Sequence, residues 1–419
     1  MPTALVLYHY FHPDDVVSAQ HFSDLCTGLA GRGWEVTVLP CNRGCRDESQ
    51  RFGAKELWEG VTIRRVWRPA FRQAFSLGRI LNTFWMLLAW SLACLRERPD
   101  ILIVGTDPLF AVLVAIPWKI LRPNTRIFHW CFDLHPEAAI ADGMFREDHL
   151  FVRLLRPWLR AAYRRCDLIG SLGACMTRLL IRYDPKLRID TYTPWALSEP
   201  PAPTRPDPEE RAAMFGSAPL GLMYSGNFGK AHAFDTILAL ARKLRPQGVP
   251  FVFCVRGNRV QELKDAVTAE DTNVSFGGFV PQRQLELRLS TADIHIVSLR
   301  SKYAGTVVPS KFQGALAAGR PILYAGPKDS AVAQWIRSFG LGWTLTEETL
   351  DEVAAQILDL RDRPEALEAL KQRCFSVYQS QFSKQAILDR MDRDFRALLR
   401  RSGSQPQEVC AGPGRDSPP

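Results

Sequence analysis

"TPWALSEPPAPTRPDP" (residues 193–208) interrupts a chain that is otherwise regular in its patterning. Its proline density excludes regular secondary structure and is typical of an interdomain linker. The same alternation of short apolar runs and helix-like segments occurs on both sides of it. The sequence therefore predicts an N-terminal domain over residues 1–195, a linker over 196–210 and a C-terminal domain over 211–380.

The apolar runs have the length of buried strands, and helical patterns separate them. One of those patterns, residues 18–30, places Phe22, Leu25, Cys26 and Leu29 on one face. This alternation predicts an α/β protein built from two Rossmann-like, doubly wound domains that face a cleft. The predicted strands are residues 3–8, 35–39, 101–105, 126–132 and 167–171, then 220–226, 249–257, 273–278, 292–299 and 320–326.

The chain beyond the second set of strands is helical in pattern from residue 350 to about residue 399. We expect residues 381–400 to form a C-terminal helix that packs back on the N-terminal domain. Residues 401–419 are rich in Gly, Pro and Ser, a composition typical of a disordered tail.

The net charge of +9 indicates an anionic partner, which leaves nucleic acid, a phosphorylated small molecule and an anionic membrane face as alternatives. Nucleic acid is disfavoured because the basic residues are not interleaved with aromatic platforms. The 10 cysteines form no CxxC pair and no Cys/His metal spacing, so we interpret them as reduced thiols of a cytoplasmic protein.

Residues 80–95 form the most apolar stretch, but Asn82, Thr83 and Ser91 interrupt it. It is shorter than the roughly 20 apolar residues that span a bilayer. A buried helix and an interfacial helix are both consistent with this pattern. Residues 64–98 hold seven Arg and a single acidic residue, Glu97, which supports a protein attached peripherally to the inner face of the cell membrane.

Residues 150–166 form a second amphipathic pattern. Arg153, Arg156, Arg160 and Arg164 fall on one stripe, and the pattern predicts that apolar residues fall opposite to it: Leu154, Leu155, Trp158, Leu159 and Ala162. An ordinary surface helix with a solvated charged face explains this pattern, and so does a helix that contacts anionic lipid.

Two glycine- or proline-containing turns precede helices of the second domain. "YSGNFGKAH" (residues 224–232) allows close backbone approach at its glycines and adds a lysine, as a diphosphate cradle requires. In "VVPSKFQGALAAGRPI" (residues 307–322) Ser310 is a candidate helix cap, and Lys311 lies in the first turn, where an anion would explain its charge. A tight strand-to-helix turn and a solvated lysine are the structural alternatives.

These turns, with "HYFHPDD" (residues 9–15) and "NVSFGGFVPQRQLELRLSTADIHIVSLR" (residues 273–300), resemble in order the motifs of the retaining GT-B glycosyltransferases that use nucleotide sugars. More narrowly they resemble the bacterial exopolysaccharide and O-antigen branch, with its colanic-acid and fucosyltransferase-like members. The resemblance implies transfer of a hexosyl or deoxyhexosyl group with retention, without a metal or cofactor. It implies donor-binding roles for Gly226, Asn227, Gly229, Lys230, Val280, Ser310 and Lys311.

The chain departs from the family pattern at two positions. The family commonly has two glutamates separated by seven residues, and these places are Thr306 and Gly314 here. The second glutamate would hold the donor ribose, so the resemblance leaves that contact open.

For the acceptor side, "FDLHPEAA" (residues 132–139) follows a predicted strand and resembles the branch's Asp-x-x-Pro-Glu motif. The resemblance makes Asp133 the first candidate for a carboxylate that orients or deprotonates the acceptor hydroxyl, and Glu137 the second. His9, His12 and Asp15, after the first predicted strand, are expected to contact the acceptor or a phosphate.

The sequence thus predicts a glycosyltransferase that passes a sugar from a nucleotide sugar to a saccharide acceptor, lipid-linked, in cell-surface polysaccharide biosynthesis. A catalytically silent scaffold of the same fold and a sugar-nucleotide epimerase are the alternatives. Thr306 and Gly314 motivate the first alternative, and the two-domain Rossmann architecture motivates the second.

Overall fold

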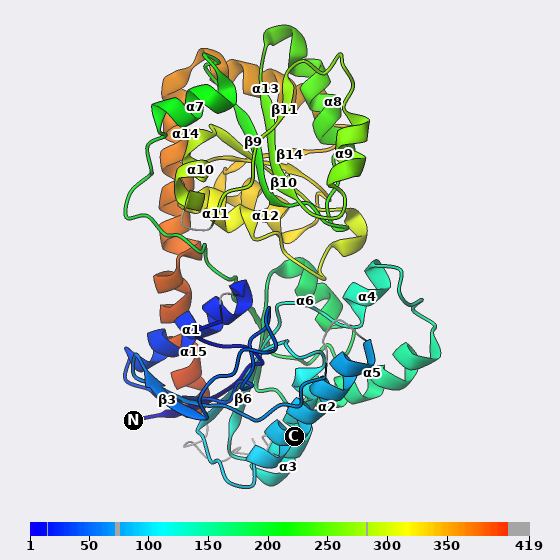
Figure 1. Ribbon diagram of the computed structural model, residues 1–419, viewed down its shortest axis with the longest axis vertical. Coiled ribbons are helices and arrows are strands. Elements are labelled where there is room, and N and C mark those ends of the chain that lie inside the picture. Colours follow the sequence, from blue (N-terminus) through cyan, green and yellow to red (C-terminus); the bar gives the residue numbers. More distant parts are fainter. Residues whose placement is uncertain (15, 72–75, 282–283, 401–419) are drawn as a thin grey trace, which may run out of the picture.

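The computed structural model describes residues 1–14, 16–71, 76–281 and 284–400. Its two lobes lie one above the other along the long axis of the molecule (Figure 1). The polypeptide completes the lower lobe, crosses to the upper lobe, and returns to the lower lobe in its last helix. Asp15, a predicted acceptor contact, lies outside the described residues. The tail over 401–419, which is predicted to be disordered, also lies outside them.

The N-terminal lobe contains an eight-stranded sheet in the order β3-β4-β2-β1-β5-β6-β7-β8. Its pairings are parallel except for the antiparallel β3–β4 pair at one edge. The chain winds outward from β1 in both directions, which creates a topological switch point beside that strand. The strands are β1 (Thr3–Leu7), β2 (Glu35–Val38), β3 (Lys55–Trp58), β4 (Val61–Arg64), β5 (Ile101–Val104), β6 (Arg126–Trp130), β7 (Leu168–Ser171) and β8 (Ile189–Thr191).

Helices cover both faces of this sheet, as expected for parallel strands whose residues are buried on two sides. In β5, for example, all four residues of "ILIV" are buried. The helical elements of the lobe are α1 (Val17–Ala30), α2 (Ser76–Ala93), η1 (Ala111–Val114), α3 (Ala115–Leu121), α4 (Glu137–Ala141), α5 (Leu150–Tyr163) and α6 (Ala174–Leu180).

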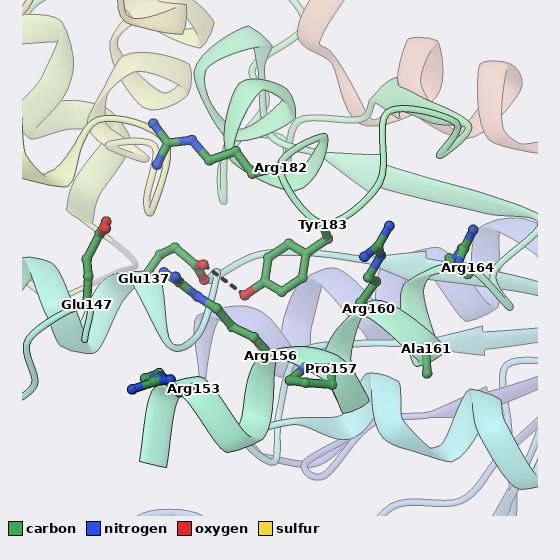
Figure 2. Close-up of a pocket in the computed structure, with 10 residues that line it drawn as sticks. All are labelled: Glu137, Glu147, Arg153, Arg156, Pro157, Arg160, Ala161, Arg164, Arg182 and Tyr183. Carbon is green, nitrogen blue, oxygen red and sulfur yellow. Dashed lines mark hydrogen bonds between the residues drawn. The ribbon is translucent and has the colours of Figure 1, made fainter. Parts of the chain in front are cut away.

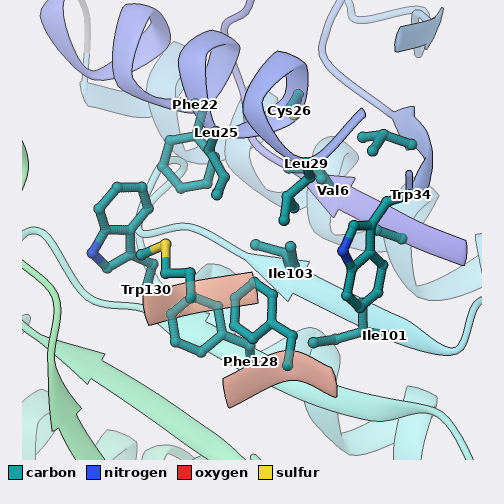
Figure 3. Close-up of a cluster of buried hydrophobic side chains, with 14 of the residues drawn as sticks. Val6, Phe22, Leu25, Cys26, Leu29, Trp34, Ile101, Ile103, Phe128 and Trp130 are labelled. Atoms are coloured by element: carbon teal, nitrogen blue, oxygen red, sulfur yellow. The ribbon is translucent and has the colours of Figure 1, made fainter. Parts of the chain in front are cut away.

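The predicted apolar face of α1 is confirmed, because Phe22, Leu25, Cys26 and Leu29 are all fully buried. Figure 3 shows these side chains meeting the aromatic and aliphatic residues of the sheet beneath them. The same core includes residues from the end of the chain: Ile387, Leu388, Met391, Phe395 and Leu398.

The upper lobe contains a six-stranded parallel sheet in the order β11-β10-β9-β12-β13-β14. Its switch point lies at β9, between β10 and β12. The strands are β9 (Leu222–Asn227), β10 (Phe251–Arg256), β11 (Val274–Phe276), β12 (Ile294–Ser298), β13 (Ile322–Ala325) and β14 (Gly342–Leu345). The helical elements are α7 (Pro208–Phe215), α8 (Asp235–Leu244), η2 (Arg245–Gln247), α9 (Val260–Ala266), α10 (Leu285–Thr291), η4 (Ser301–Tyr303), α11 (Lys311–Ala317), α12 (Ala331–Phe339), α13 (Leu350–Asp362) and α14 (Pro364–Val377).

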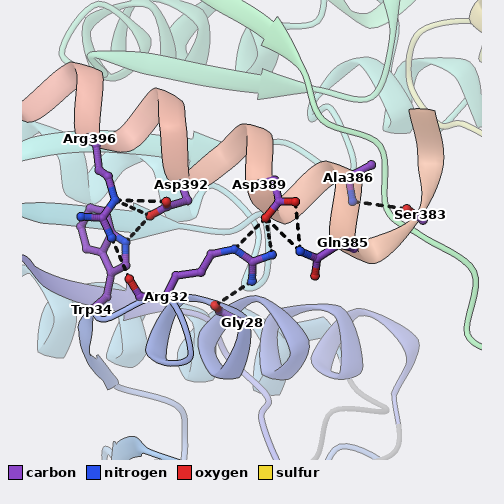
Figure 4. A network of polar contacts seen from close by, with 9 residues as sticks. All are labelled: Gly28, Arg32, Trp34, Ser383, Gln385, Ala386, Asp389, Asp392 and Arg396. Atoms are coloured by element: carbon purple, nitrogen blue, oxygen red, sulfur yellow. Dashed lines mark hydrogen bonds and ion pairs between the residues drawn. The ribbon is translucent and has the colours of Figure 1, made fainter. Parts of the chain in front are cut away.

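A single π-helical turn, η5 (Tyr378–Phe382), joins α14 to the last helix, α15 (Lys384–Arg400). Helix α15 packs against α1 of the other lobe, where Asp389 accepts hydrogen bonds from Arg32 at 2.6 and 3.0 Å. Asp392 accepts one from Trp34 at 2.6 Å. Figure 4 shows this network along the length of the helix. The contact tethers the end of the chain to its beginning.

Candidate active site

The loop that follows β9 and the turn that precedes α11 meet at the lower edge of the upper sheet. Gly226 has φ +128°, a conformation that favours glycine, and a Cβ added to it would lie 2.9 Å from Cε of Lys311. The Lys311 ammonium lies 5.1 Å from the centre of the Tyr224 ring. Two motifs about 80 residues apart in the chain therefore share one contact.

Lys311 has an unusual environment for a lysine. Burial lowers its pKa to about 8, and no carboxylate pairs with it in the described part of the chain. Its nearest polar partner is His232, with Nζ and Nε2 3.3 Å apart. An anion bound here would supply the missing counter-charge and further stabilise the charged form of the lysine.

His232 is kept neutral by the same surroundings. Burial, and then the charge of Lys311, lower its pKa to about 3. Its Nδ1 donates a hydrogen bond to the carbonyl of Ser298 at 2.7 Å, so Nε2 carries the lone pair that accepts from Lys311. His232 lies within the glycine-containing stretch quoted above but was not among the predicted site residues.

The other predicted donor residues lie at the same edge. Asn227 and Lys230 are exposed, and Gly229 lies next to the Asn227 amide. Val280 follows β11, beside Phe279, whose ring stacks under the Arg256 guanidinium at 4.1 Å. Because β9, β10 and β11 are parallel neighbours, their following loops lie at one edge of the sheet.

The turn before α11 differs from its prediction in one respect. Ser310 precedes the helix, but its side chain makes no capping hydrogen bond, so the predicted cap is wrong. Its backbone has helical φ and ψ of −62° and −14°, whereas a capping residue is usually extended. The Ser310 hydroxyl therefore remains free of that local bond.

The two positions without glutamate have separate surroundings. Thr306 is buried and donates a hydrogen bond to the Tyr303 carbonyl at 2.9 Å. Gly314 has room for a Cβ, which would lie 3.4 Å from a methyl carbon of Leu289. The neighbouring Gln313 amide is buried, and neither its nitrogen nor its oxygen has a hydrogen-bond partner among the residues described.

On the lower lobe, Asp133 opens into a cavity of about 240 Å³ together with Asp107, His135 and Tyr8. The Asp133 side chain is exposed at the mouth of this recess, while the protein atoms that line the recess crowd its carboxyl group. Desolvation, and then the nearby charge of Asp107, raise the pKa of Asp133 to about 6. A carboxylate with such a pKa suits a general base that works near neutral pH.

Asp107 also holds His9, with His9 Nδ1 and Asp107 Oδ1 3.4 Å apart. Burial by itself lowers the pKa of His9, but the charge and hydrogen bond of Asp107 outweigh it and raise the pKa to about 9. His9 Nε2 has no hydrogen-bond partner among the described residues. Sequence reasoning missed Asp107, although it follows a predicted strand within "GTDP" (residues 105–108).

The remaining candidates of this lobe face two other cavities. Glu137 accepts a hydrogen bond from the Tyr183 hydroxyl at 2.8 Å and lines an arginine-rich cavity (Figure 2). Burial raises its pKa despite that bond. His12 stacks on Trp58, with ring centres 4.0 Å apart, and lines a cavity of about 470 Å³. Asp133 and Glu137, the first and second candidates for the same catalytic role, therefore line different cavities.

Direct contacts join the two lobes beside these residues. The Leu134 amide lies 3.4 Å from the Thr306 carbonyl, and Tyr303 donates a hydrogen bond to Asp142 at 2.6 Å. A cavity of about 280 Å³ lies between the lobes, with Glu137 and Arg182 on one wall and Lys302 and Thr306 on the other. The candidate catalytic loop and the turn leading to Lys311 thus border a common cleft.

Helix α2 buries only a narrow stripe that includes Asn82, Met86 and Trp90. Arg79, Arg96 and Arg98, on and beyond the helix, are exposed. No helix in the described part of the chain has the length and apolarity that crossing a membrane requires. The exposed apolar residues of α2 are Leu77, Ile80, Leu81, Phe84, Trp85, Leu88 and Leu92.

Helix α5 corrects the predicted amphipathic pattern. Leu159 and Ala162 are buried as expected, but Leu154 and Trp158 are each 63% exposed. Its apolar residues therefore divide into a core-facing stripe and an exposed one, and the arginines form a third stripe.

The two Rossmann-like lobes, the cleft between them and the helix that returns to the first lobe form the GT-B fold. Residues 18–193 match the family described as glycosyl transferase 4-like domain. The chain is 25% identical over 337 residues to the probable glycosyltransferase WbjE of Pseudomonas aeruginosa, covering 78% of this chain and 81% of that protein.

Solved structures share the whole fold. Sucrose-phosphate synthase from Thermosynechococcus elongatus superposes with a TM-score of 0.68 at 14% identity, covering 96% of this chain and 99% of that one. HepE from Anabaena in complex with UDP superposes with a TM-score of 0.62 at 12% identity, covering 95% and 100%.

Proposed function

We propose that this glycosyltransferase transfers a sugar from a nucleotide sugar bound to the upper lobe onto a lipid-linked saccharide bound to the lower lobe. The observation that carries the proposal is the partly buried Lys311, which has no carboxylate partner in the described chain and lies against Gly226. A diphosphate is the ligand that this arrangement suits. The UDP bound to HepE supports a nucleotide as its carrier.

In this proposal each lobe has a separate task. Lys311 and Lys230 neutralise the charge that builds up on the leaving diphosphate, and neutral His232 keeps the Lys311 ammonium in position. Asp133 accepts the proton of the acceptor hydroxyl. The oxygen of that hydroxyl then becomes the new glycosidic oxygen. The resemblance to the retaining group supports retention at the donor carbon, and the branch it resembles supports a hexosyl or deoxyhexosyl donor.

The exposed face of α2 supports an acceptor presented at a membrane. Its side chains would enter the headgroup boundary while the flanking Arg79, Arg96 and Arg98 contact anionic lipid. Each such arginine adds about 1 kcal/mol near an anionic surface, so several suffice for reversible attachment. Peripheral attachment to the inner face of the cell membrane, in cell-surface polysaccharide biosynthesis, is therefore part of the proposal.

Thermal unfolding with a panel of nucleotide sugars tests the donor assignment. A ligand at 100 times its dissociation constant adds roughly 2.7 kcal/mol to the free energy of unfolding. We expect one nucleotide family to stabilise the wild type and to lose this effect in Lys311→Ala. A panel without any stabilising member would contradict the proposal.

The absence of glutamate at Thr306 and Gly314 favours one alternative, a catalytically silent scaffold. Donor binding without hydrolysis or transfer, measured with the stabilising nucleotide sugar and membrane extracts as acceptor, would identify such a scaffold. Interconversion of the donor sugar without transfer would instead identify an epimerase.

A further inference from the structure

Outside the cavity that holds Asp133, the lower lobe has a larger cavity of about 660 Å³ beside α5. Arg153, Arg156, Arg160 and Arg164 reach it from α5, and Arg182 reaches it from the segment after α6. Figure 2 shows Arg182 on the opposite side of the space from the α5 arginines. The stripe predicted from the sequence therefore lines a concave space, in which Arg153, Arg160 and Arg164 remain exposed to solvent.

Most of this positive charge is uncompensated. Arg164 pairs with Asp184 at 2.7 Å, but Arg153, Arg156, Arg160 and Arg182 form no ion pair with any described carboxylate. Glu137 and Glu147 also line the cavity, and Glu137 already accepts from Tyr183 through one oxygen. The arginines outnumber these two carboxylates, of which Glu137 feels the charges of Arg156 and Arg182. Guanidinium groups in excess of the nearby carboxylates repel one another, and a multivalent anion relieves that repulsion.

The surroundings of the cavity are different at its two ends. Glu137, Glu147 and Arg182 also line the cavity between the lobes, so the space continues toward the cleft. On α5 itself, Leu150, Leu154 and Trp158 follow one another at intervals of four residues and are 66%, 63% and 63% exposed. An anionic group in the cavity would thus have the cleft on one side and an apolar stripe on the other.

We propose that this arginine cavity binds the diphosphate of the acceptor lipid, with the saccharide directed to the cleft and the hydrocarbon lying along the apolar stripe of α5. Guanidinium groups bind phosphate oxygens in a bidentate manner, and four of them match a group with several negative oxygens. The lipid's identity as acceptor rests on the function proposed above. The site itself rests on the cavity, its unpaired arginines and the adjoining apolar stripe.

Binding of farnesyl diphosphate, a short prenyl diphosphate, tests the site directly by isothermal titration below its micelle concentration. We expect Arg156→Gln/Arg160→Gln to weaken binding at least 10-fold, and Arg337→Gln, an exposed arginine of the other lobe, to leave it unchanged. Trp158→Ser should weaken binding of farnesyl diphosphate but not of inorganic pyrophosphate. Equal affinity of wild type and double variant for farnesyl diphosphate would overturn the proposal.

Two further measurements are needed. The first distinguishes a lipid diphosphate from a phospholipid headgroup as the ligand, and the second distinguishes failure of this site from failure of the proposed function. Flotation with phosphatidylglycerol vesicles should change little in the double variant. A loss of flotation with unchanged farnesyl diphosphate binding would make the cavity a phospholipid headgroup site and overturn the acceptor assignment. Stabilisation by the nucleotide sugar should persist in the double variant. Arginine-dependent diphosphate binding by a protein that binds no nucleotide sugar would retain the site and refute only the transferase proposal.

Discussion

The pH dependence of transfer depends on the two carboxylates in the lower cavity. Desolvation and Asp107 hold the pKa of Asp133 at about 6, so about 90% of it is ionised at pH 7 and about 10% at pH 5. If ionised Asp133 is the base, kcat/KM falls about tenfold for each pH unit well below this pKa. Activity is therefore lost as the pH falls through about 6, not as it rises.

Asp107→Asn changes this acidic limb of the pH profile of kcat/KM without removing the base, Asp133. Because the Asp107 charge is the second cause of the shift, its removal lowers the pKa of Asp133, while desolvation, the first cause, still holds it above 3.8. The acid limb should move to lower pH. Asp133→Asn should lower turnover by about 100-fold or more and abolish the limb, with donor affinity nearly unchanged.

The assay is kcat/KM for transfer between about pH 4.5 and 8, with donor binding measured in the same buffers to exclude unfolding. Glu137→Gln is the matched control, because this carboxylate faces the arginine cavity. A flat profile in the folded wild type, or a normal rate in Asp133→Asn, would refute the reasoning. A limb that moves in Glu137→Gln but not in Asp107→Asn would transfer the role to Glu137.

Three other predictions concern binding and stability. Lys311→Ala and Lys230→Ala should each weaken nucleotide-sugar binding by about 1.5–3 kcal/mol in calorimetry, whereas Lys243→Ala, away from the loops, should not. Unchanged affinity in both Lys311→Ala and Lys230→Ala would remove the phosphate assignment. Phe84→Ser/Leu88→Ser in α2 should reduce flotation with anionic liposomes, and high salt should reduce it in the wild type; extraction only by detergent would show insertion instead. Phe395→Ala should lower the free energy of unfolding by about 3–5 kcal/mol in denaturant titrations, whereas Arg393→Ala, at an exposed position, should lower it by less than about 0.5 kcal/mol. A small effect in both variants would show that α15 contributes little to stability.

The strands with two buried faces were predictable because their apolar runs are continuous. All ten predicted strands are present, and their bounds differ from the predicted ones by at most two residues at either end. The hairpin β3–β4 and the edge strands β8 and β14 were missed, since "KELW" is largely exposed, "IDT" has no buried residue and "GWTL" lacks fully buried residues until its last position. Periodicity reports burial, and edge strands have little of it.

The candidate site was predictable where a motif was continuous in the sequence. Gly226 and Lys311 were expected near one anion, and the chain does bring them into contact. Asp107 was missed because its role depends on Asp133 and His9, and only the order of the strands in the sheet brings these three residues together. The exposure of Leu154 and Trp158 was equally hidden, since a helical pattern separates faces without saying which neighbours cover them.

The position of α15 has a consequence for synthesis of the protein. The residues that complete the first lobe's core, such as Leu388 and Phe395, are made about 200 residues after the last strand of that lobe. At 5–20 residues per second this interval is roughly 10–40 s. During that time the groove along α1 stays open while the second lobe folds. The nascent first lobe therefore presents an apolar surface that chaperones can bind, and ribosomes that stop before residue 384 release a chain whose first core lacks its final helix.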